Sequence, residues 1–590
     1  MWEDKARFYP DMIPAQPVYN LPDNVMKWAP QFFRMAQQDN SFLRKVSIWL
    51  PLLLAGVLAL GMFIGLRYQA ASAVSQGGAD LAKLHRSLAG QGKIEELLRY
   101  IDAKYVEAAD DDVLTSKAID AIMKELDPHS NYISAEDLIA INEQLEGNFD
   151  GIGVEFMILD DTIVVVTPLA GGPSEAVGIQ AGDKIVTIED SIVAGVELGT
   201  QDIFSLLRGE KGTEVKVGIK RVGQKDLLSF NITRDKIPVH SVDVAMMLDE
   251  KTGFIKVNRF SATTYDEFVQ SLEKLVEQHK MVDLVIDLRH NPGGYLTQAT
   301  NMLSQLFPEK GKLLVYTEGR TVKRTEYNTN GRPFYNIGEV VVLIDEGSAS
   351  ASEIMAGAVQ DHDRGVLVGR RSFGKGLVQE QYPLRDGSAL RLTVARYYTP
   401  SGRCIQKDYE EEGGDAYDRD MEDRYINGEL SEEGNIQIAD TTKFFTDNGY
   451  VVYGGGGITP DVFVPLDTFV LREDYLRWRQ YAAGFVFRYV EQEKDLATRY
   501  ELNSFVSSYQ VPNKVFQEYI QYAREQGEET AVPTNSRVMK ELNRFLKARI
   551  ARQLYGDEGF FAVWNKQDDM VLEALRVLRT ENPLVAARKE

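Results

Sequence analysis

The sequence is poor in cysteine and in positive charge. Its 590 residues contain one cysteine, Cys404, which excludes an intrachain disulfide and a metal site built from several cysteines. The 66 lysine and arginine residues are outnumbered by 88 aspartate and glutamate residues. The net charge of −22 argues against nucleic acid as the main partner, because phosphate binding needs clustered basic side chains. None of the six histidines lies in a triad signature or an H-E-x-x-H motif, so we predict no metal or other cofactor.

One long run of the sequence carries no charge. Residues 46–66 are uncharged over 21 positions, enough for a helix to span a bilayer. Two basic residues precede the run and one follows it, which favours a cytoplasmic amino terminus and an exported remainder. The alternative is a cleaved signal peptide, for which residues 71–73 offer an A-x-A site. The polar leader over residues 1–45 and the length of the run favour a retained transmembrane anchor.

Changes in hydrophobic pattern divide the rest of the chain. Apolar residues at helical spacing predict a helical module over residues 80–147, and short strands with glycine turns predict a β domain over residues 148–236. Alternating apolar strands and amphipathic helices predict an α/β core over residues 237–470, with a mainly parallel sheet covered by helices. Within it, residues 405–440 are dense in acids and glycine, and we interpret them as a solvated, mobile insertion. Amphipathic helices over residues 471–590 indicate a structural or partner-binding domain.

The β domain contains a short glycine motif. Gly151, Ile152, Gly153 and Val154 begin the first of several short strands, and together with residues 181–183 they resemble a bacterial PDZ domain. The resemblance implies that the loop before this strand binds a chain-terminal carboxylate and that the strand pairs with the incoming peptide. The alternative is any small barrel with glycine turns, because GxG alone is common.

A serine-rich turn joins a strand to a helix in the core. Residues 340–344 are apolar and mostly β-branched, residues 345–347 form a turn, and residues 348–352 read Ser-Ala-Ser-Ala-Ser before an amphipathic helix. A serine at a helix start lies at the positive end of the helix dipole, where free N–H groups can bind a developing oxyanion. The pattern predicts a serine nucleophile within residues 348–352.

A lysine lies between two glycines after the next strand. Burial in apolar surroundings would lower the pKa of Lys375 and let it act as the base for a serine. The sequence from Gly369 to Lys375 also approaches a phosphate-binding loop, but Gly376 stands where that motif needs serine or threonine, and the following residues look extended rather than helical. A third alternative is a serine-rich helix start with an unrelated surface lysine.

Six motifs occur together in one order. They are LDPHSNY at 126–132, GIGVEF at 151–156, DLRHNPGG at 287–294, DEGSASASE at 345–353, SFGKGLVQ at 372–379 and GGGITPD at 455–461. Together they resemble the carboxyl-terminal processing peptidases, also called tail-specific proteases. The resemblance implies a multidomain α+β protein with a PDZ domain and an α/β protease core of the ClpP/crotonase-like type.

The resemblance also implies roles for individual residues. Ser350 matches the nucleophile, Lys375 the general base, and Gln379 the residue that holds the lysine amine in place. The N–H groups of Ala351 and of a glycine in the NPGG loop, Gly293 or Gly294, match the oxyanion hole.

Other residues match the family less well. Asp361 stands where the family often has an acid, so it is a candidate supporting residue, although a role in the local fold is an equal alternative. Arg370 and Arg371 stand where the family more often has an acidic and then a small residue, a difference that we expect to alter substrate contacts.

Together these predictions describe a membrane-anchored serine endopeptidase. We expect it to recognise protein carboxyl termini through the PDZ domain and to cleave extracytoplasmic proteins, as a single-pass protein of a bacterial inner membrane with its catalytic part in the periplasm or otherwise outside the cytoplasm. The expected partners are protein or peptide substrates with accessible carboxyl termini and the membrane, but not nucleic acid. The alternative is a catalytically inactive, PDZ-containing scaffold that binds peptides.

Overall fold

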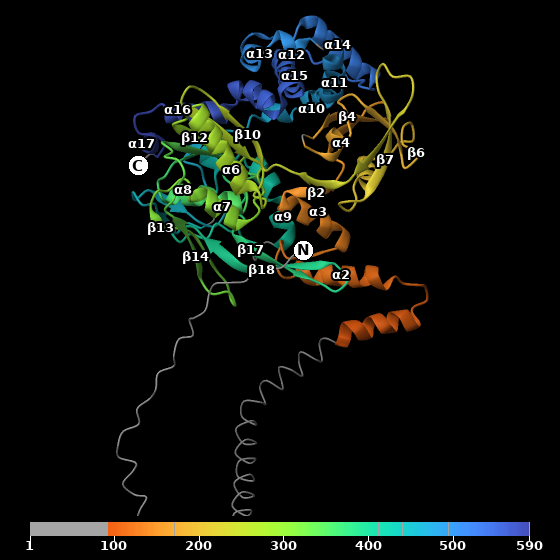
Figure 1. The fold of residues 1–590 in the computed structure, drawn as a ribbon. Coiled ribbons are helices and arrows are strands. Elements are labelled where there is room, and N and C mark those ends of the chain that lie inside the picture. Colours follow the sequence, from red (N-terminus) through yellow and green to blue (C-terminus); the bar gives the residue numbers. More distant parts are fainter. Residues whose placement is uncertain (1–91, 170, 410–412, 439, 494, 589–590) are drawn as a thin grey trace, which may run out of the picture. The chain divides into compact units, whose positions relative to one another are not determined.

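A computed structural model describes residues 92–588, except residues 170, 410–412, 439 and 494 (Figure 1). The chain divides into two units, residues 1–114 and 115–590. The leader and the anchor predicted over residues 1–66 lie outside the described residues. Of the helices that are described, none is both long and apolar enough to cross a membrane. In the first unit the described residues form a helix over 92–104. The helix α2 (Asp111–Lys124) begins near the end of this unit.

The core is built on a six-stranded sheet. Its order is β10 (Val242–Met247), β11 (Thr252–Val257), β12 (Asp283–Asp287), β15 (Val340–Ile344), β16 (Val366–Gly369) and β21 (Val462–Phe463). β10 is antiparallel to β11, and all other neighbours are parallel, which confirms the prediction of a mainly parallel sheet. β12 and β15 are adjacent, so the NPGG loop and the serine turn both begin at the same edge of the sheet.

The two faces of this sheet are covered by different parts of the chain. Alternate residues of each strand point to opposite faces, as the period of two requires. Ile286, Val342 and Ile344 pack against α6 (Thr264–Glu273) with its π-helical end η2 (Lys274–Gln278), α7 (Leu296–Leu303) and α8 (Ala351–Asp361). Val341 and Leu343 face the other way.

A helix near the carboxyl end of the chain covers that second face. Residues Met570, Val571, Ala574 and Val577 of α16 (Asp569–Leu578) form one apolar cluster with strand residues of the sheet, among them Val341. α16 is drawn in blue in Figure 1 beside the green strands. Residues 569–578 are therefore part of the protease core, although the sequence placed them in a separate helical domain.

A second sheet brings distant segments together. Strand β18 (Ala389–Tyr398) pairs with β1 (Asn131–Ile133), β13 (Lys310–Glu318) and β17 (Leu377–Pro383), and β13 also pairs with β14 (Thr325–Asn330). β1 and β17 flank β18 on opposite sides, because both pair with its residues 389–391. The Gln379 amide of β17 donates to the carbonyl oxygen of His129, so the amino-terminal LDPHSNY motif contacts the strand that follows Lys375.

The predicted PDZ region is a separate β domain with its own core. Buried aliphatic residues such as Ile163, Val165 and Val217 fill it. Its elements are β2 (Asn148–Gly151), β3 (Val154–Ile158), β4 (Ile163–Pro168), α4 (Pro173–Ala176), β5 (Lys184–Ile188), β6 (Ser191–Ile192), α5 (Thr200–Leu207), β7 (Glu214–Lys220), β8 (Leu228–Thr233) and β9 (Asp235–Pro238).

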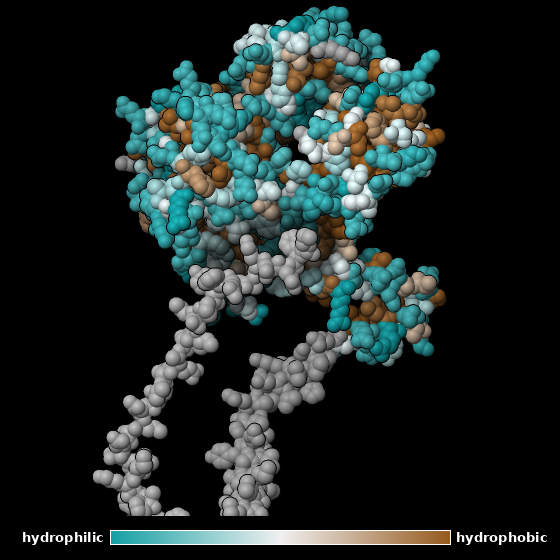
Figure 2. All heavy atoms as spheres, in the orientation of Figure 1, coloured by the Kyte–Doolittle hydropathy of each residue, from teal (hydrophilic) through white to brown (hydrophobic). Residues whose placement is uncertain are grey.

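The remaining helices form a mostly aromatic bundle and a few connecting elements. Tyr475, Trp478 and Tyr519 are almost completely buried in the bundle. The bundle elements are η4 (Thr468–Leu471), α10 (Glu473–Arg479), α11 (Ala482–Gln492), α12 (Leu496–Arg499), α13 (Leu502–Ser508), α14 (Asn513–Glu525) and α15 (Ser536–Trp564). The others are α3 (Ala135–Glu146), α9 (Gly413–Ile426), η3 (Glu433–Asn435), β19 (Lys443–Phe445), β20 (Val451–Tyr453), η5 (Asn565–Gln567) and α17 (Pro583–Ala587). The face drawn in Figure 2 is mainly hydrophilic, with hydrophobic residues in separate groups.

Candidate active site

Ser350 lies at the junction between β15 and α8. Its backbone has φ 55° and ψ −113°, a conformation that non-glycine residues rarely adopt and that costs about 1–3 kcal/mol. The surrounding structure holds it there. The Ser350 N–H donates to the Glu353 carboxylate over 2.8 Å, and the Tyr397 hydroxyl donates to the Ser350 carbonyl oxygen over 3.0 Å. Such strain is typical of functional sites.

The other serines of the turn have structural hydrogen bonds. The Ser348 hydroxyl is buried, donates to the Leu288 carbonyl oxygen over 2.8 Å and accepts from the Asp345 N–H over 2.9 Å. The Ser352 hydroxyl is also buried and donates to the Asn291 carbonyl oxygen over 3.0 Å. Of the three serines, Ser350 lines an open cavity of about 710 Å³. The geometry therefore favours Ser350 as the serine that can meet a substrate.

Lys375 lines the same cavity from the loop between β16 and β17. Its Nζ donates to Gln379 Oε1 over 2.9 Å, and the Gln379 amide in turn donates to the carbonyl oxygen of His129. Strand β17 begins at Leu377, so no helix follows Gly374 and Lys375, and the phosphate-binding alternative lacks the helix that it needs. The partial burial of Lys375 also disagrees with an unrelated surface lysine.

The surroundings of Lys375 destabilise its charged form. Burial is the main cause that lowers the pKa of Lys375, and the positive charge of Arg391 lowers it further. The carboxylates of Glu353 and Asp127 act in the opposite direction. A neutral lysine amine can accept a proton, which is the property that a general base requires.

Glu353 links the two predicted reacting residues, and the sequence analysis overlooked it. Its side chain is fully buried. One carboxylate oxygen accepts from the N–H groups of Ser350 and Lys375 over 2.8 and 2.9 Å, and the other accepts from the Gly374 N–H over 2.7 Å and the Ser372 hydroxyl over 2.5 Å. Burial raises the pKa of Glu353 to about 7, against the effect of these hydrogen bonds. The signal was present as S-x-x-E, the capping-box spacing from Ser350 to Glu353.

The predicted oxyanion donors lie beside Ser350. A Cβ atom on Gly293 would lie 2.7 Å from Ser350 Cβ and 2.9 Å from the Ala351 nitrogen, so only glycine fits there. The Gly293 N–H donates to the Asn291 side chain over 2.8 Å. Within the described part of the chain, the N–H groups of Ala351 and Gly294 donate to no other protein group. Ala351 and Gly294 are therefore the pair available to an oxyanion, and this role stays a prediction.

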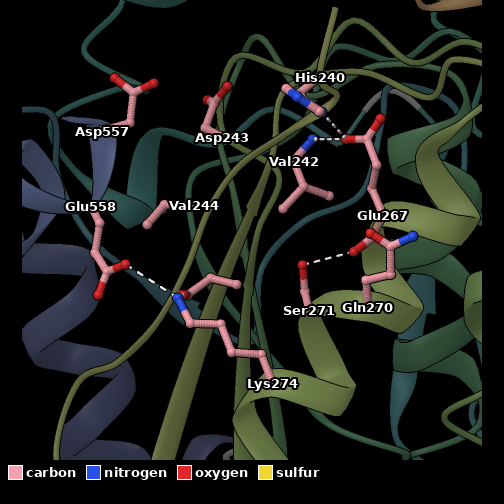
Figure 3. Close-up of a pocket in the computed structure, with 11 residues that line it drawn as sticks. His240, Val242, Asp243, Val244, Glu267, Gln270, Ser271, Lys274, Asp557 and Glu558 are labelled. Carbon is pink, nitrogen blue, oxygen red and sulfur yellow. Dashed lines mark hydrogen bonds and ion pairs between the residues drawn. The ribbon is translucent and has the colours of Figure 1, made fainter. Parts of the chain in front are cut away.

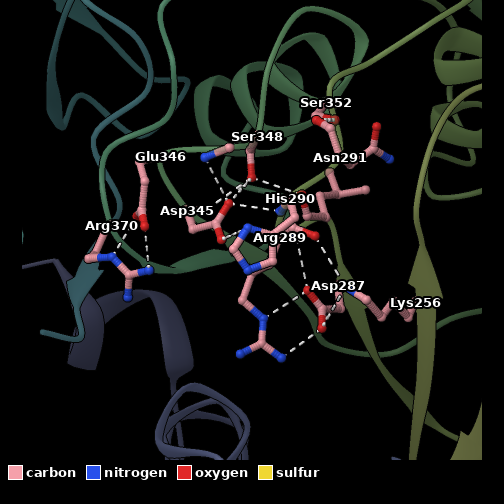
Figure 4. A network of polar contacts seen from close by, with 12 residues as sticks. Lys256, Asp287, Arg289, His290, Asn291, Asp345, Glu346, Ser348, Ser352 and Arg370 are labelled. Carbon is pink, nitrogen blue, oxygen red and sulfur yellow. Dashed lines mark hydrogen bonds and ion pairs between the residues drawn. The ribbon is translucent and has the colours of Figure 1, made fainter. Parts of the chain in front are cut away.

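A polar network fixes the NPGG loop against the serine turn (Figure 4). The His290 N–H donates to the Asp345 carboxylate over 2.9 Å, and the buried Asn291 amide donates to the Val257 carbonyl oxygen over 2.9 Å. At the start of the loop, Arg289 pairs with Asp287 over 2.7 Å. These contacts hold the glycines and the serine at a fixed separation.

The same arginine connects the loop to the carboxyl-terminal helix. Arg289 Nη1 lies 2.9 Å from both carboxylate oxygens of Asp568, the residue that caps the start of α16. The buried Asp287 has a strongly lowered pKa: burial opposes the shift, but the charges of Arg289 and Lys256 outweigh it. The helix that covers one face of the sheet is thus tied to the loop beside Ser350.

Asp361 lies at the other end of α8, away from the residues that line the cavity. Its carboxylate pairs with Arg403 over 2.7 Å and accepts from the Ser401 N–H over 3.0 Å. Both side chains of the pair are almost completely buried. This position fits the alternative in which Asp361 stabilises the local fold.

The expected effect of Arg370 and Arg371 on substrate contacts stays a prediction. Neither residue lines the cavity. Arg370 pairs with Glu346 over 2.6 Å, and Arg371 pairs with Glu429 over 2.7 Å. In both pairs the side chains are largely buried, so the two arginines are neutralised by partners within the protein.

The interpretation of residues 405–440 as a solvated segment is wrong for much of its length. α9 (Gly413–Ile426) and the residues that follow it pack on the core, where Tyr417, Arg424, Glu429 and Leu430 are buried. The acidic composition did not predict this burial, because acidic residues of the segment pair with buried basic residues that are distant in the sequence, such as Arg371 for Glu429.

The PDZ residues predicted to bind peptides form the entry to β3. Gly153 has φ +71°, and the carbonyl oxygens of Ile152 and Gly153 accept from the N–H groups of Ser174 and Leu169. β3 begins at Val154 and is the edge strand of its sheet. An edge strand can accept an additional strand, so peptide binding by residues 151–154 stays a prediction with suitable geometry.

A second cavity of about 440 Å³ lies between β10, α6 and the end of α15 (Figure 3). Its serine and its lysine are already engaged: the Ser271 hydroxyl donates to the Glu267 carbonyl oxygen, and Lys274 pairs with Glu558. No serine and lysine are therefore free to act together there. Elsewhere, the described ranges contain no group of three histidine, cysteine or acidic residues arranged to bind a metal ion.

Known protein families match three parts of the chain. Peptidase family S41 matches residues 251–412, and the PDZ domain family matches residues 151–233. A family of unknown function, DUF8443, matches residues 474–556, within the aromatic helical bundle. The first match contains the serine turn and the loop of Lys375.

Individual proteins are similar over the same region. A carboxy-terminal-processing protease of Bartonella bacilliformis is 36% identical over 326 residues, which cover 55% of this chain and 73% of the relative. The carboxy-terminal processing protease CtpB of Bacillus subtilis is 34% identical over 53% of this chain and 65% of its own length. Among solved structures, a photosystem II D1 C-terminal processing protease is 30% identical, with a TM-score of 0.31 over 53% of this chain and 84% of that chain.

Proposed function

The chain belongs to the carboxy-terminal processing proteases, a family of serine-type peptidases, and we propose that it hydrolyses peptide bonds with Ser350 as nucleophile and Lys375 as general base. One observation carries this proposal. Ser350 and Lys375 line one cavity, and Glu353 accepts hydrogen bonds from the main chain of both.

The reaction follows from the groups around Ser350. Neutral Lys375 accepts the hydroxyl proton as Ser350 Oγ attacks the substrate carbonyl carbon. The oxygen of the tetrahedral intermediate is stabilised by the N–H groups of Ala351 and Gly294. The C–N bond then breaks, and Lys375 returns the proton to the leaving amine. Water, deprotonated by Lys375, hydrolyses the acyl-enzyme and restores Ser350.

Ser350→Ala and Lys375→Ala are the direct tests. Each variant should lose cleavage of an unstructured protein substrate by about 10³-fold or more, because the nucleophile and its base act as one unit. Ser271→Ala is the matched control, since its hydroxyl lies in the second cavity, and it should cleave like the wild type. Wild-type turnover by Ser350→Ala would refute the assignment. Peptide binding without cleavage by the wild-type protein would instead support the inactive scaffold.

The cavity wall suggests which substrate side chains are accepted. Apolar residues contribute to it, among them Ile141, Leu145, Phe260, Leu296 and Ile354. An apolar side chain next to the cleaved bond would bury surface there, at about 25 cal/mol per Å². Replacing that side chain by aspartate in a test peptide should raise KM.

We also propose that the PDZ domain recruits substrates by their carboxyl termini. The supporting observation is the edge strand β3 beside residues 151–153. A peptide with a free carboxyl terminus should bind the full chain more tightly than the same peptide with an amidated terminus. Equal affinity for the two peptides would argue against carboxylate recognition.

The uncharged run over residues 46–66 supports a proposal of membrane anchoring with extracytoplasmic substrates. Bacterial fractionation should find the full chain in the inner membrane, and a protease added to spheroplasts should digest the part after residue 66. A protein released by deletion of residues 46–66 would agree with this, whereas a soluble full chain cut at residues 71–73 would support the signal peptide.

A further inference from the structure

The part of the insertion that packs on the core contains charged side chains that are buried. Residues 413–430, called the clamp segment below, comprise α9 and the turn after it. Arg424 and Glu429 of this segment are 1% and 2% exposed. Burying such side chains is costly unless they are paired, so their partners indicate what the segment does.

Arg424 holds the main chain that leads to Lys375. Its guanidinium donates to the carbonyl oxygen of Ser372 over 2.9 Å and to that of Phe373 over 3.3 Å. Its own charge is balanced by Asp420, 3.1 Å away on the same helix. One arginine thus binds two consecutive peptide groups just before the predicted base.

A second ion pair anchors the start of the same loop. Arg371 and Glu429 form a two-pronged contact of 2.7 and 2.8 Å, and Arg371 also donates to the Gly456 carbonyl oxygen. Two-pronged contacts fix orientation as well as distance. The loop is therefore held at residues 371, 372 and 373.

Tyr417 is connected to Lys375 through a second series of contacts. Its hydroxyl lies 2.6 Å from His129 Nε2 in a hydrogen bond, and the carbonyl oxygen of His129 accepts from the Gln379 amide. Gln379 Oε1 accepts from Lys375 Nζ. A continuous chain of contacts runs from α9 to the amine of Lys375.

We propose that the clamp segment is a positioning element for the base, acting through Arg424 on the main chain before Lys375 and through Tyr417 on His129 and Gln379. This inference rests on the proposed function. Apart from the Arg424–Asp420 pair within the segment, the buried polar contacts of the clamp segment described above end on the loop before Lys375 or on His129. Loosening the segment should misplace the amine and admit water to its surroundings.

The test compares variants by kinetics and by pH profile. Tyr417→Phe keeps the ring beside His129 but removes the hydroxyl, and Arg424→Ala removes the carbonyl contacts. We expect Arg424→Ala to lower kcat by about tenfold to a hundredfold and Tyr417→Phe by a smaller factor, with KM changed little, since a small displacement of a catalytic group has effects of this size. Tyr425→Phe is the control, because Tyr425 lies on the same helix and is 49% exposed.

The pH profile separates positioning from a purely structural role. Water near Lys375 would weaken the effect of burial, so the acid limb of kcat/KM should move to higher pH in Arg424→Ala. Arg424 is not among the charged groups that act directly on Lys375, which are Arg391, Glu353 and Asp127. Lower thermal stability with an unshifted limb and wild-type kcat, in either clamp variant, would overturn the proposal. A protein that cleaves normally without the Ser350 hydroxyl would overturn the proposed function instead.

Discussion

Replacing Glu353 by glutamine is the sharpest test of how the site is held together. Glutamine has the same shape, but it offers one acceptor oxygen and one NH2 group in place of two acceptor oxygens. The carboxylate accepts from the N–H groups of Ser350, Gly374 and Lys375 and from the Ser372 hydroxyl. Some of these donors must therefore lose their acceptor.

The geometry decides how the glutamine will turn. If its NH2 faces Ser372 and Gly374, the Ser372 hydroxyl, which also accepts from the Ile458 N–H, can rotate to accept from the NH2, and the Gly374 N–H is the one N–H group left unpaired. The opposite orientation leaves the N–H groups of both Ser350 and Lys375 unpaired. A buried N–H without a partner costs about 1–3 kcal/mol, so the first orientation should be preferred and the loss should be about 1–3 kcal/mol.

This loss should depend on pH. Burial raises the pKa of Glu353 to about 7, above its ordinary value of 4.5. Between these values the folded wild-type protein binds more protons than the unfolded chain, so its stability falls as the pH rises, by about 3 kcal/mol in total. Glutamine does not titrate. The stability of the wild type relative to Glu353→Gln should therefore fall between about pH 5 and pH 8.

Urea unfolding of both proteins at the two pH values measures this difference. Glu346→Gln serves as the control whose stability difference should not change between the two pH values. Burial acts to raise the pKa of Glu346, but the hydrogen bond and charge of Arg370 lower it below its ordinary value of 4.5, so the advantage of Glu346 over glutamine is fully present at both pH values and is lost only at lower pH. A Glu353→Gln difference that stays constant or grows with pH would show that Glu353 is ionised throughout, and would refute the reasoning.

Three further predictions follow from single contacts. Gly293→Ala would place a Cβ 2.7 Å from a carbonyl oxygen at φ +97°, and we expect at least about a hundredfold loss of kcat in a folded protein; normal kinetics would contradict this. Asp361→Ala leaves Arg403 buried without its partner and should destabilise the core by about 3–5 kcal/mol in thermal denaturation, whereas an unchanged melting temperature would exclude a structural role. Asp568→Ala removes the cap of α16 and one partner of Arg289, so it should cost about 1–2 kcal/mol and also lower kcat; a stability change without a kinetic one would separate the helix from the loop.

The sheet and the serine turn were predictable because their signals are local. Residues 340–344 are apolar without interruption, as a strand buried on both faces must be, and all five are buried. The turn and helix that follow them carry their own start signals. The contact between Glu353 and Ser350 was also predictable from their spacing. The other partners of Glu353, from residue 372 onward, depend on tertiary structure.

The insertion and α16 were not predictable in the same way. Acidic composition favours solvent only when no basic partner is close, and the arginine that pairs with Glu429 is 58 residues away in the sequence. The apolar face of α16 was visible as a pattern, but nothing local says that it completes a sheet formed about 200 residues earlier. Long-range pairing of this kind is decided by packing rather than by local preference.

The position of α16 has a consequence for how the protein folds during synthesis. Strand β16 ends at Gly369 and α16 at Leu578, and at 5–20 residues per second the ribosome needs about 10–40 s to make the chain between them. Throughout that interval Val341, Leu343 and Val368 have no helix to cover them. One apolar face of the nascent core therefore stays uncovered during this interval. We expect the protein to depend most on chaperones during translation.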